Sequence, residues 1–325
     1  MSYINQVKPR QLCPHRSRTE ETIQVSKNDQ PSGRQRQPCH PHMPRCVRPQ
    51  TSGREPRLVD MTPLEPFVID ESLQGQAMIV RIFAAIDYVV RSHDHQVASP
   101  ALLTQSDTDF ARLCAELPDA PVDLATSVSA SAAITRVSLV AVHQQLATPG
   151  SHVVPIAIHA RAALVASGRI LYCLGPSSAE QRHRHAQRVL LQEANSYLRA
   201  LKSADAYAVM QKVVPTEGTV DQVKAQVREL ERSITRLQGE RDMLDEMASV
   251  VGALLCELGP EGEDLEVVRQ AHQEHVMWLF HFYSGFAHGY GWPTLCPPGE
   301  LVADLVVITG VAALAMQVLE ERTQQ

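Results

Sequence analysis

Apolar residues recur at helical spacing over most of this chain. In residues 73–92, for example, Ile82, Ile86 and Val89 return every three or four positions. The same spacing, punctuated by proline and glycine, predicts further helices over residues 99–117, 122–147, 152–174, 177–210, 264–288 and 300–322. No segment alternates polar and apolar residues as a half-buried strand would. The pattern therefore predicts an all-α fold, an irregular bundle of about eight helices between residues 62 and 322.

The clearest periodicity lies in residues 220–251. Apolar residues there alternate between spacings of three and four, a heptad pattern about four repeats long. The pattern contains Val220, Val223, Val227, Leu230, Ile234, Leu237, Leu244, Ala248 and Val251. Arg241 is its one polar interruption. We expect a single long helix whose apolar seam packs against another helix, either in the same chain or in a second copy.

Residues 1–60 show no such periodicity. Pro, Gln, Ser, Arg and His dominate, so this segment cannot bury enough apolar surface to offset its chain entropy. We therefore expect a disordered arm over residues 1–60, followed by a helical domain over residues 61–325. The arm is basic and the rest of the chain is acidic, within a net charge of −6. A basic arm is typical of a solvated tail, but it also suits contact with nucleic acid, an anionic membrane or its own acidic body.

Residues 301–319 are apolar enough to be compared with a membrane span. Their length approaches the ~20 residues that a spanning helix needs, but Asp304 and Gln317 interrupt them and the flanking charges are acidic. We interpret the segment as a buried core helix, with a membrane anchor as the alternative. The seven scattered cysteines form no Cys-x-x-Cys pair and no secretory-signal pattern is present, so the sequence favours a cytoplasmic location.

Two clusters carry side chains suited to binding. Arg182, Arg184 and Arg188 lie near the start of the helix expected after residue 177, where they would bind phosphate or simply form a solvated face. The other cluster lies in the N-terminal arm, but its spacing matches no common zinc motif, so we expect no metal and no cofactor. Its members are Cys13, His15, Cys39, His40, His42 and Cys46.

Residues 275–294, HVMWLFHFYSGFAHGYGWPT, hold the most distinctive side chains. His281 and His288 are two helical turns apart, so they share one helix face at a distance of about 10 Å, with Ser284 between them. Such a pair suits acid–base chemistry on a substrate that bridges both imidazoles, for example a phosphodiester. The alternative is structural: His288 acts as an N-cap or forms a hydrogen bond to a turn, while Gly285 and Gly289 allow close helix approach.

Three short motifs resemble those of a group of uncharacterised all-helical actinobacterial proteins. They are Ser284-Gly285-Phe286-Ala287-His288-Gly289, His159-Ala160-Arg161-Ala162-Ala163-Leu164 and Glu180-Gln181-Arg182-His183-Arg184. The group is in turn similar to the HEPN superfamily, and the resemblance covers roughly residues 152–322. It implies a metal-independent ribonuclease of the abortive-infection type, in which an arginine and a nearby histidine cleave RNA. His288 stands at the family's histidine, and His281 stands where the family has its arginine.

The sequence thus leaves three functions open. The first is a non-enzymatic helical interaction protein that forms a homodimer by helix pairing. The second is a HEPN-like ribonuclease, or its degenerate descendant, in phage defence, with His288, His281 and Ser284 as catalytic residues and RNA as partner. The third is a membrane-associated protein anchored by residues 301–319. A cleft that holds both histidines between basic walls would favour the second function, whereas a buried His288 without a cleft would favour the first.

Overall fold

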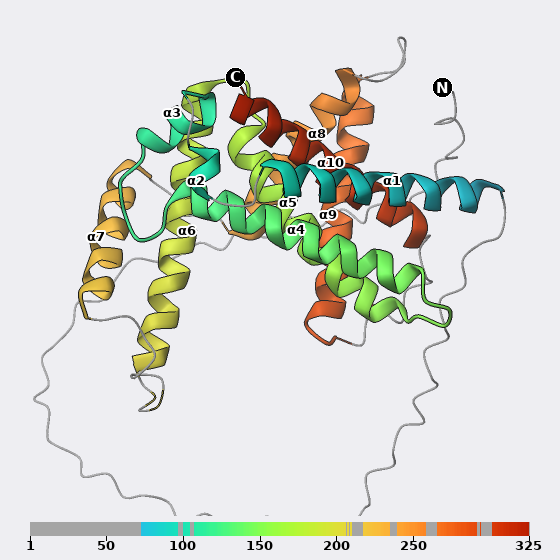
Figure 1. Cartoon of the computed structure of the whole chain (residues 1–325), viewed down its shortest axis with the longest axis horizontal. Helices are drawn as coiled ribbons and strands as arrows, with labels where there is room; N and C mark the ends of the chain where they lie inside the picture. Colours follow the sequence, from blue (N-terminus) through green and yellow to red (C-terminus); the bar gives the residue numbers. More distant parts are fainter. Residues whose placement is uncertain are drawn as a thin grey trace, which may run out of the picture. The chain divides into compact units, whose positions relative to one another are not determined.

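The fold is all-α, as the apolar periodicity predicts (Figure 1). The computed structural model describes residues 73–96, 100–104, 107–205, 207, 209, 217–234, 239–257, 265–290, 293 and 301–324. No strand occurs among them. The arm expected over residues 1–60 lies outside the described residues. Contacts divide the chain into one unit up to Met61 and a second from Thr62, and all the described residues belong to the second unit.

Most predicted helices occur close to their expected bounds. In chain order the helices are α1 Leu73–Gln96, α2 Pro100–Leu103, α3 Asp109–Ala115, α4 Leu124–Leu146, α5 Val153–Leu174, α6 Ala179–Asp205, α7 Glu217–Ser233, α8 Glu240–Glu257, α9 Leu265–Ala287 and α10 Leu301–Gln324. The single helix expected over residues 99–117 is wrong, because α2 and α3 take its place. Thr108 separates them: its extended backbone and its side chain, which accepts a hydrogen bond from the Ala111 amide at 3.2 Å, begin α3 as an N-cap.

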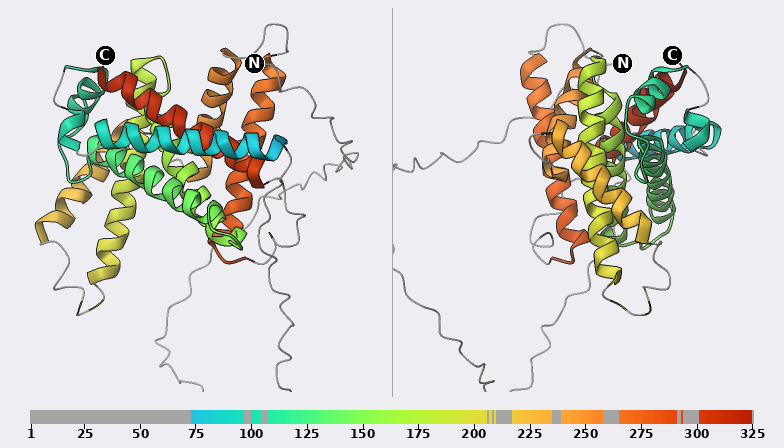
Figure 2. Two further views of the ribbon diagram at one scale, coloured as in Figure 1. Left: turned by 45° about the vertical axis from the view of Figure 1, so that its right-hand side comes forward. Right: turned by 90° about the vertical axis from the view of Figure 1, so that its left-hand side faces the viewer.

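Helix α5 forms the centre of the bundle. It is apolar on nearly all sides and almost completely buried over its second half, as expected for a helix surrounded by others. Helices α8 and α9 pack on one side of it and α4 and α10 on the other, with α1 across α10 and α4 (Figure 2). Helix α6 packs against α5 and also against α7.

The expected long helix over residues 220–251 is interrupted. Helix α7 ends at Ser233 and α8 begins at Glu240, with the Gly239 carbonyl accepting the first helical hydrogen bond from the Met243 amide. Glycine is favourable at such a boundary and costly within a helix. The predicted burial is nevertheless confirmed, since the apolar seam positions that the structure describes are all buried or partly buried. The half of the seam on α7 packs against α6, and the half on α8 packs against α5 and α9.

Three helices among the described residues, α4, α5 and α10, are long and apolar enough to cross a membrane. About half of each apolar window is buried inside the bundle. Asp304, which interrupts the apolar run of α10, is satisfied within the protein. Its carboxylate accepts a hydrogen bond from the Tyr283 hydroxyl at 3.1 Å and lies 3.4 Å from His275 Nε2. Burial raises the pKa of Tyr283 well above its usual value, so this hydroxyl stays a donor.

Candidate functional site

The three side chains predicted as catalytic lie along one side of the C-terminal half of α9. His281 and His288 are exposed, and Ser284 between them is partly buried. The Ser284 hydroxyl donates to the Phe280 carbonyl at 2.6 Å, which is common for serine inside a helix. The helical spacing thus holds, although His288 itself lies just beyond the last residue of α9.

Arg161 of α5 reaches this side of α9 from the core. Its Nε donates to the Ser284 hydroxyl at 2.8 Å, and its guanidinium lies over the Phe280 ring, 5.4 Å from the ring centre. Its Nη2 donates to Glu240 of α8 at 3.1 Å. The motifs around Arg161 and Ser284, which are 123 residues apart, therefore meet where three helices join.

The charge of Arg161 is balanced inside the protein. Glu240 pairs with Arg161, and its carboxylate also lies 3.9 Å from the Arg169 guanidinium. Arg169 uses its other terminal nitrogen to bind Glu193 at 2.8 Å. Glu193 in turn accepts a short hydrogen bond from Ser127 of α4. This chain of polar contacts links α4, α5, α6 and α8, so its clearest role is to fix how these helices pack.

His288 is explained by the way in which α9 ends. The Tyr290 amide donates to the Gly285 carbonyl at 2.9 Å and the Gly289 amide to the Phe286 carbonyl at 3.0 Å, the two bonds of a Schellman motif. Gly289 has a φ of 70°, which glycine adopts without strain. His288 is thus the last residue before a left-handed turn. The close helix approach expected at Gly289 does not occur among the described residues, because none of them would lie within 4 Å of a Cβ added there.

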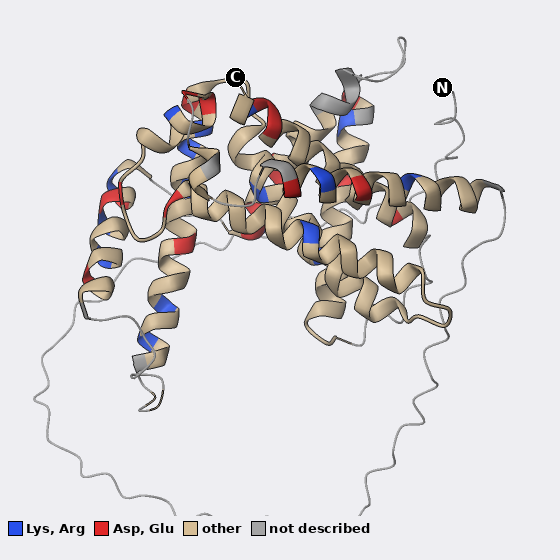
Figure 3. Cartoon of the chain, viewed as in Figure 1, with Lys and Arg blue, Asp and Glu red and all other residues tan. Residues whose placement is uncertain are grey.

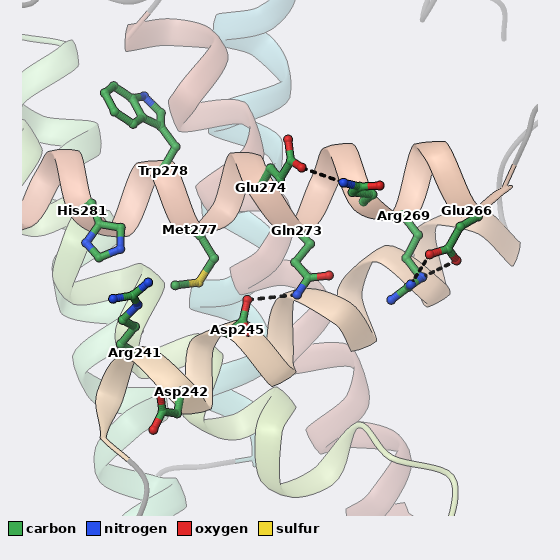
Figure 4. Close-up of a pocket in the computed structure, with 11 residues that line it drawn as sticks. Arg241, Asp242, Asp245, Glu266, Arg269, Gln273, Glu274, Met277, Trp278 and His281 are labelled. Carbon is green, nitrogen blue, oxygen red and sulfur yellow. Dashed lines mark hydrogen bonds and ion pairs between the residues drawn. The ribbon is translucent and has the colours of Figure 1, made fainter. Parts of the chain in front are cut away.

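A groove of about 760 Å³ runs between α8 and α9 (Figure 4). His281 and Arg241 lie near each other at one end, and Gln273 donates to Asp245 across the groove at 2.9 Å. The lining residues are Arg241, Asp242, Asp245, Glu266, Arg269, Gln270, Gln273, Glu274, Met277, Trp278 and His281. His288 is not among them. The two histidines therefore share a helix side, but this groove does not hold both of them. His288 is exposed, so the condition of a buried His288 is not met either.

Arg182 is buried and forms its polar contacts inside the protein. Its side chain is only 8 % exposed, and it donates to the Pro176 and Ser177 carbonyls and to Asp109 at 2.7–3.1 Å. Arg322 of α10 binds the same Asp109 oxygen at 3.1 Å. We call Asp109, Arg182 and Arg322 the α3 latch. Burial lowers the pKa of Arg182, but the nearby carboxylate favours its charged form.

Arg184 and Arg188 have different surroundings. Arg184 is exposed and lies 4.0 Å from Glu180 one turn earlier, which is a typical surface pair. Arg188 donates to the Tyr172 hydroxyl at 3.2 Å and lies 3.5 Å from Glu246 of α8. The three arginines predicted to bind phosphate thus each lie beside a different carboxylate, those of Asp109, Glu180 and Glu246.

Sequence reasoning missed Glu240 and Arg241 as neighbours of the predicted site. Arg241 did carry a signal, because it is the one polar residue in the heptad pattern and therefore marks a point where the seam leaves the core. Nothing in the local sequence identifies Glu240 as the partner of Arg161, since that contact depends on how α5 and α8 pack.

Neither the search for metal-binding groups among the described residues nor the comparison with known proteins assigns a role to this geometry. Among the residues that the structure describes, no three His, Cys, Asp or Glu side chains are grouped so that they could hold a metal ion. The Cys and His cluster between Cys13 and Cys46 lies outside those residues. No family model matches the chain, and neither a curated protein nor a solved structure matches it.

Proposed function

We propose that the protein is a non-enzymatic helical interaction protein that forms a homodimer through α9. One observation carries this proposal. The outward side of α9 has an exposed stripe at alternating spacings of four and three, which we call the α9 stripe: Val267, Ala271, Glu274, Trp278 and His281. Val267 is 61 % exposed and Trp278 is 51 % exposed.

This spacing is the one that helices use to pack side by side. A heptad stripe that no other described part of the chain covers suits a helix of a partner. Tryptophan is the residue type that most often dominates binding energy in protein interfaces, because it buries a large rigid surface. Trp278 is held in place by stacking on Phe282, with 5.6 Å between ring centres, so little conformational freedom is lost when it is covered.

A second copy of the chain fits this stripe. If two α9 helices cross antiparallel with Trp278 at the two-fold axis, Glu274 of one protomer faces His281 of the other, and the pair occurs twice. The groove, which Glu274, Trp278 and His281 of the stripe help to line, also carries both signs of charge. Two arginines, Arg241 and Arg269, line it together with four acidic residues. A surface with both signs is able to complement itself, as a two-fold interface requires.

Removing the central aromatic ring should weaken the dimer. We expect Trp278→Ala to raise the dimer dissociation constant at least tenfold, measured by sedimentation velocity over a range of concentrations. Tyr290→Ala is the matched control, because Tyr290 is similarly exposed but lies beyond the end of α9. Glu274→Arg should also weaken the dimer, and adding His281→Glu should restore it. Equal association of wild type, Trp278→Ala and Glu274→Arg would contradict the proposal.

The second candidate function is a HEPN-like ribonuclease, or its degenerate descendant. It is favoured by the position of Arg161, whose guanidinium contacts Ser284 between the two histidines and so places a permanent cation beside them. Metal-free cleavage of RNA needs a proton acceptor and a proton donor, and His288 is the residue that matches the family's histidine.

We expect no cleavage of labelled RNA by purified protein in the presence of a chelator. Arg161 is neutralised by Glu240, and the two histidines do not share the groove. The comparison is wild type against His288→Ala. Equal background cleavage by both proteins would indicate contamination. Cleavage by the wild type alone would overturn the non-enzymatic proposal.

A further inference from the structure

The α9 stripe contains one carboxylate and one imidazole. Its members are Val267, Ala271, Glu274, Trp278 and His281, so Glu274 and His281 are the two that can carry a charge. Glutamate side chains are ionised at neutral pH, whereas an imidazole gains or loses its proton near neutrality. The net charge of the stripe near neutral pH therefore depends on the protonation of His281.

The carboxylate of Glu274 is not neutralised by the described part of its own chain. It accepts a hydrogen bond from the amide of Gln270 at 2.9 Å, which is a neutral donor, and no described basic side chain pairs with it. Covering such a carboxylate in an interface costs free energy, because it loses water without gaining an opposite charge. A partner that covers Trp278, one turn further along α9, must therefore place a cation beside Glu274.

In the proposed antiparallel dimer, the group in that position is the partner subunit's His281. Glu274 lies four residues before Trp278 and His281 lies three residues after it, which is about 6 Å and about 4.5 Å along the helix axis. With Trp278 at the two-fold axis, Glu274 of one protomer and His281 of the other come to nearly the same level. A parallel pair of α9 helices would instead place the two glutamates side by side and the two histidines side by side.

Two arginines lie near His281 within a single chain. Arg241 of α8 stands beside it at one end of the groove (Figure 4). The His281 ring centre is 5.3 Å from that of Phe280, and the Arg161 guanidinium lies over the same Phe280 ring. Arg161 is paired with Glu240 at 3.1 Å, so Arg241 is the cation that faces His281 without a described ion pair of its own.

The acidic neighbours of His281 in its own chain lie on α8. Asp242 and Asp245 line the groove, where Asp245 accepts from Gln273 at 2.9 Å, and Arg241 lies between Asp242 and His281 in the view of Figure 4. Over the bundle as a whole, acidic and basic residues are interspersed in the view of Figure 3. All these groups belong to the monomer and the dimer alike. The charge that association adds beside His281 is therefore the Glu274 carboxylate of the partner.

We propose that dimer formation through α9 takes up protons at His281, so that the homodimer tightens as the solution becomes mildly acidic. This inference rests on the proposed function. The carboxylate of the partner favours the protonated imidazole in the dimer only, so a dimer holds more protons than two separate chains. By linkage, association strengthens as the pH falls through the range in which imidazole titrates, and the gain is lost as the pH rises.

The test is sedimentation velocity of the full chain at pH 6, 7 and 8 and constant ionic strength. The dissociation constant of the wild-type dimer should be at least tenfold lower at pH 6 than at pH 8. His281→Gln should make it independent of pH. Glu274→Gln should also do so, and at pH 8 this variant should dimerise more tightly than the wild type, because no unpaired carboxylate is covered. His152→Gln, at an exposed histidine before α5 that forms no capping hydrogen bond, is the matched control and should keep the pH dependence.

Three outcomes would overturn this proposal and leave the homodimer in place. They are a dissociation constant that is the same at pH 6 and pH 8, a dimer that weakens on acidification as the parallel arrangement requires, and a pH dependence that survives in His281→Gln. A wild type that stays monomeric at all three pH values would overturn the homodimer as well. Circular dichroism at each pH distinguishes a loss of the dimer from unfolding.

Discussion

Leu230→Asp or Leu244→Asp should each lower the free energy of unfolding by about 3–5 kcal/mol, because either change places an unpaired charge in an apolar seam. Both leucines are at most 1 % exposed. Leu244 packs directly on the backbone of α5, since a Cβ added at Gly168 would lie 2.6 Å from Leu244 Cδ2. Urea unfolding followed by circular dichroism measures the effect.

Two other seam positions act as controls for this result. Ile234→Asp should cost less, because Ile234 is only partly buried at the end of α7. Arg241→Asp should leave the stability close to that of the wild type, because this seam position is exposed beside the groove. Wild-type stability of Leu230→Asp or Leu244→Asp would show that the seam faces water, against the structure.

Asp109→Ala should lower the free energy of unfolding by about 2–3 kcal/mol, because it leaves Arg182 and Arg322 of the α3 latch without their shared carboxylate. Breaking a fully buried pair costs about 3–5 kcal/mol, and the Asp109 side chain is a quarter exposed, so we expect the lower value. Asp107→Ala is the matched control. Its side chain is 91 % exposed and 3.6 Å from Arg112, and such surface pairs contribute little.

The α3 latch also predicts a dependence on pH. The hydrogen bond from Arg112, together with the charges of Arg182 and Arg322, lowers the pKa of Asp109 below its usual value. A lowered pKa in the folded state means that the stabilisation is complete above the unfolded pKa of about 3.9 and is lost as the pH falls through the folded value. The difference in stability between wild type and Asp109→Ala should therefore be constant near neutrality and shrink below about pH 4. A difference that grows on acidification would contradict this assignment.

The sequence predicts this fold well wherever local signals coincide with packing. Helix α4 is an example, because Asp123 caps its N-terminus and accepts the Thr126 amide at 2.7 Å just before an apolar stretch. The division between α7 and α8 was missed for an equally physical reason. The heptad spacing continues across residues 234–240, so the apolar pattern alone gives no sign that the two halves pack against different helices.

The candidate site could be predicted only in part. Spacing alone placed His281, Ser284 and His288 along one side of a helix, because that depends on local geometry. The contact between Arg161 and Ser284 joins residues of α5 and α9, and only tertiary packing creates it. His288 stood out in the sequence beside Gly289, but the structure explains the pair by the end of α9.

The most direct test of the central proposal is the mass of the wild-type protein in solution. Sedimentation equilibrium at several concentrations, at neutral pH and without lipid, measures it. The proposal predicts that the mass rises with concentration and levels off at twice the 35.9 kDa of one chain. A mass that stays at 35.9 kDa up to the highest soluble concentration would contradict the homodimer.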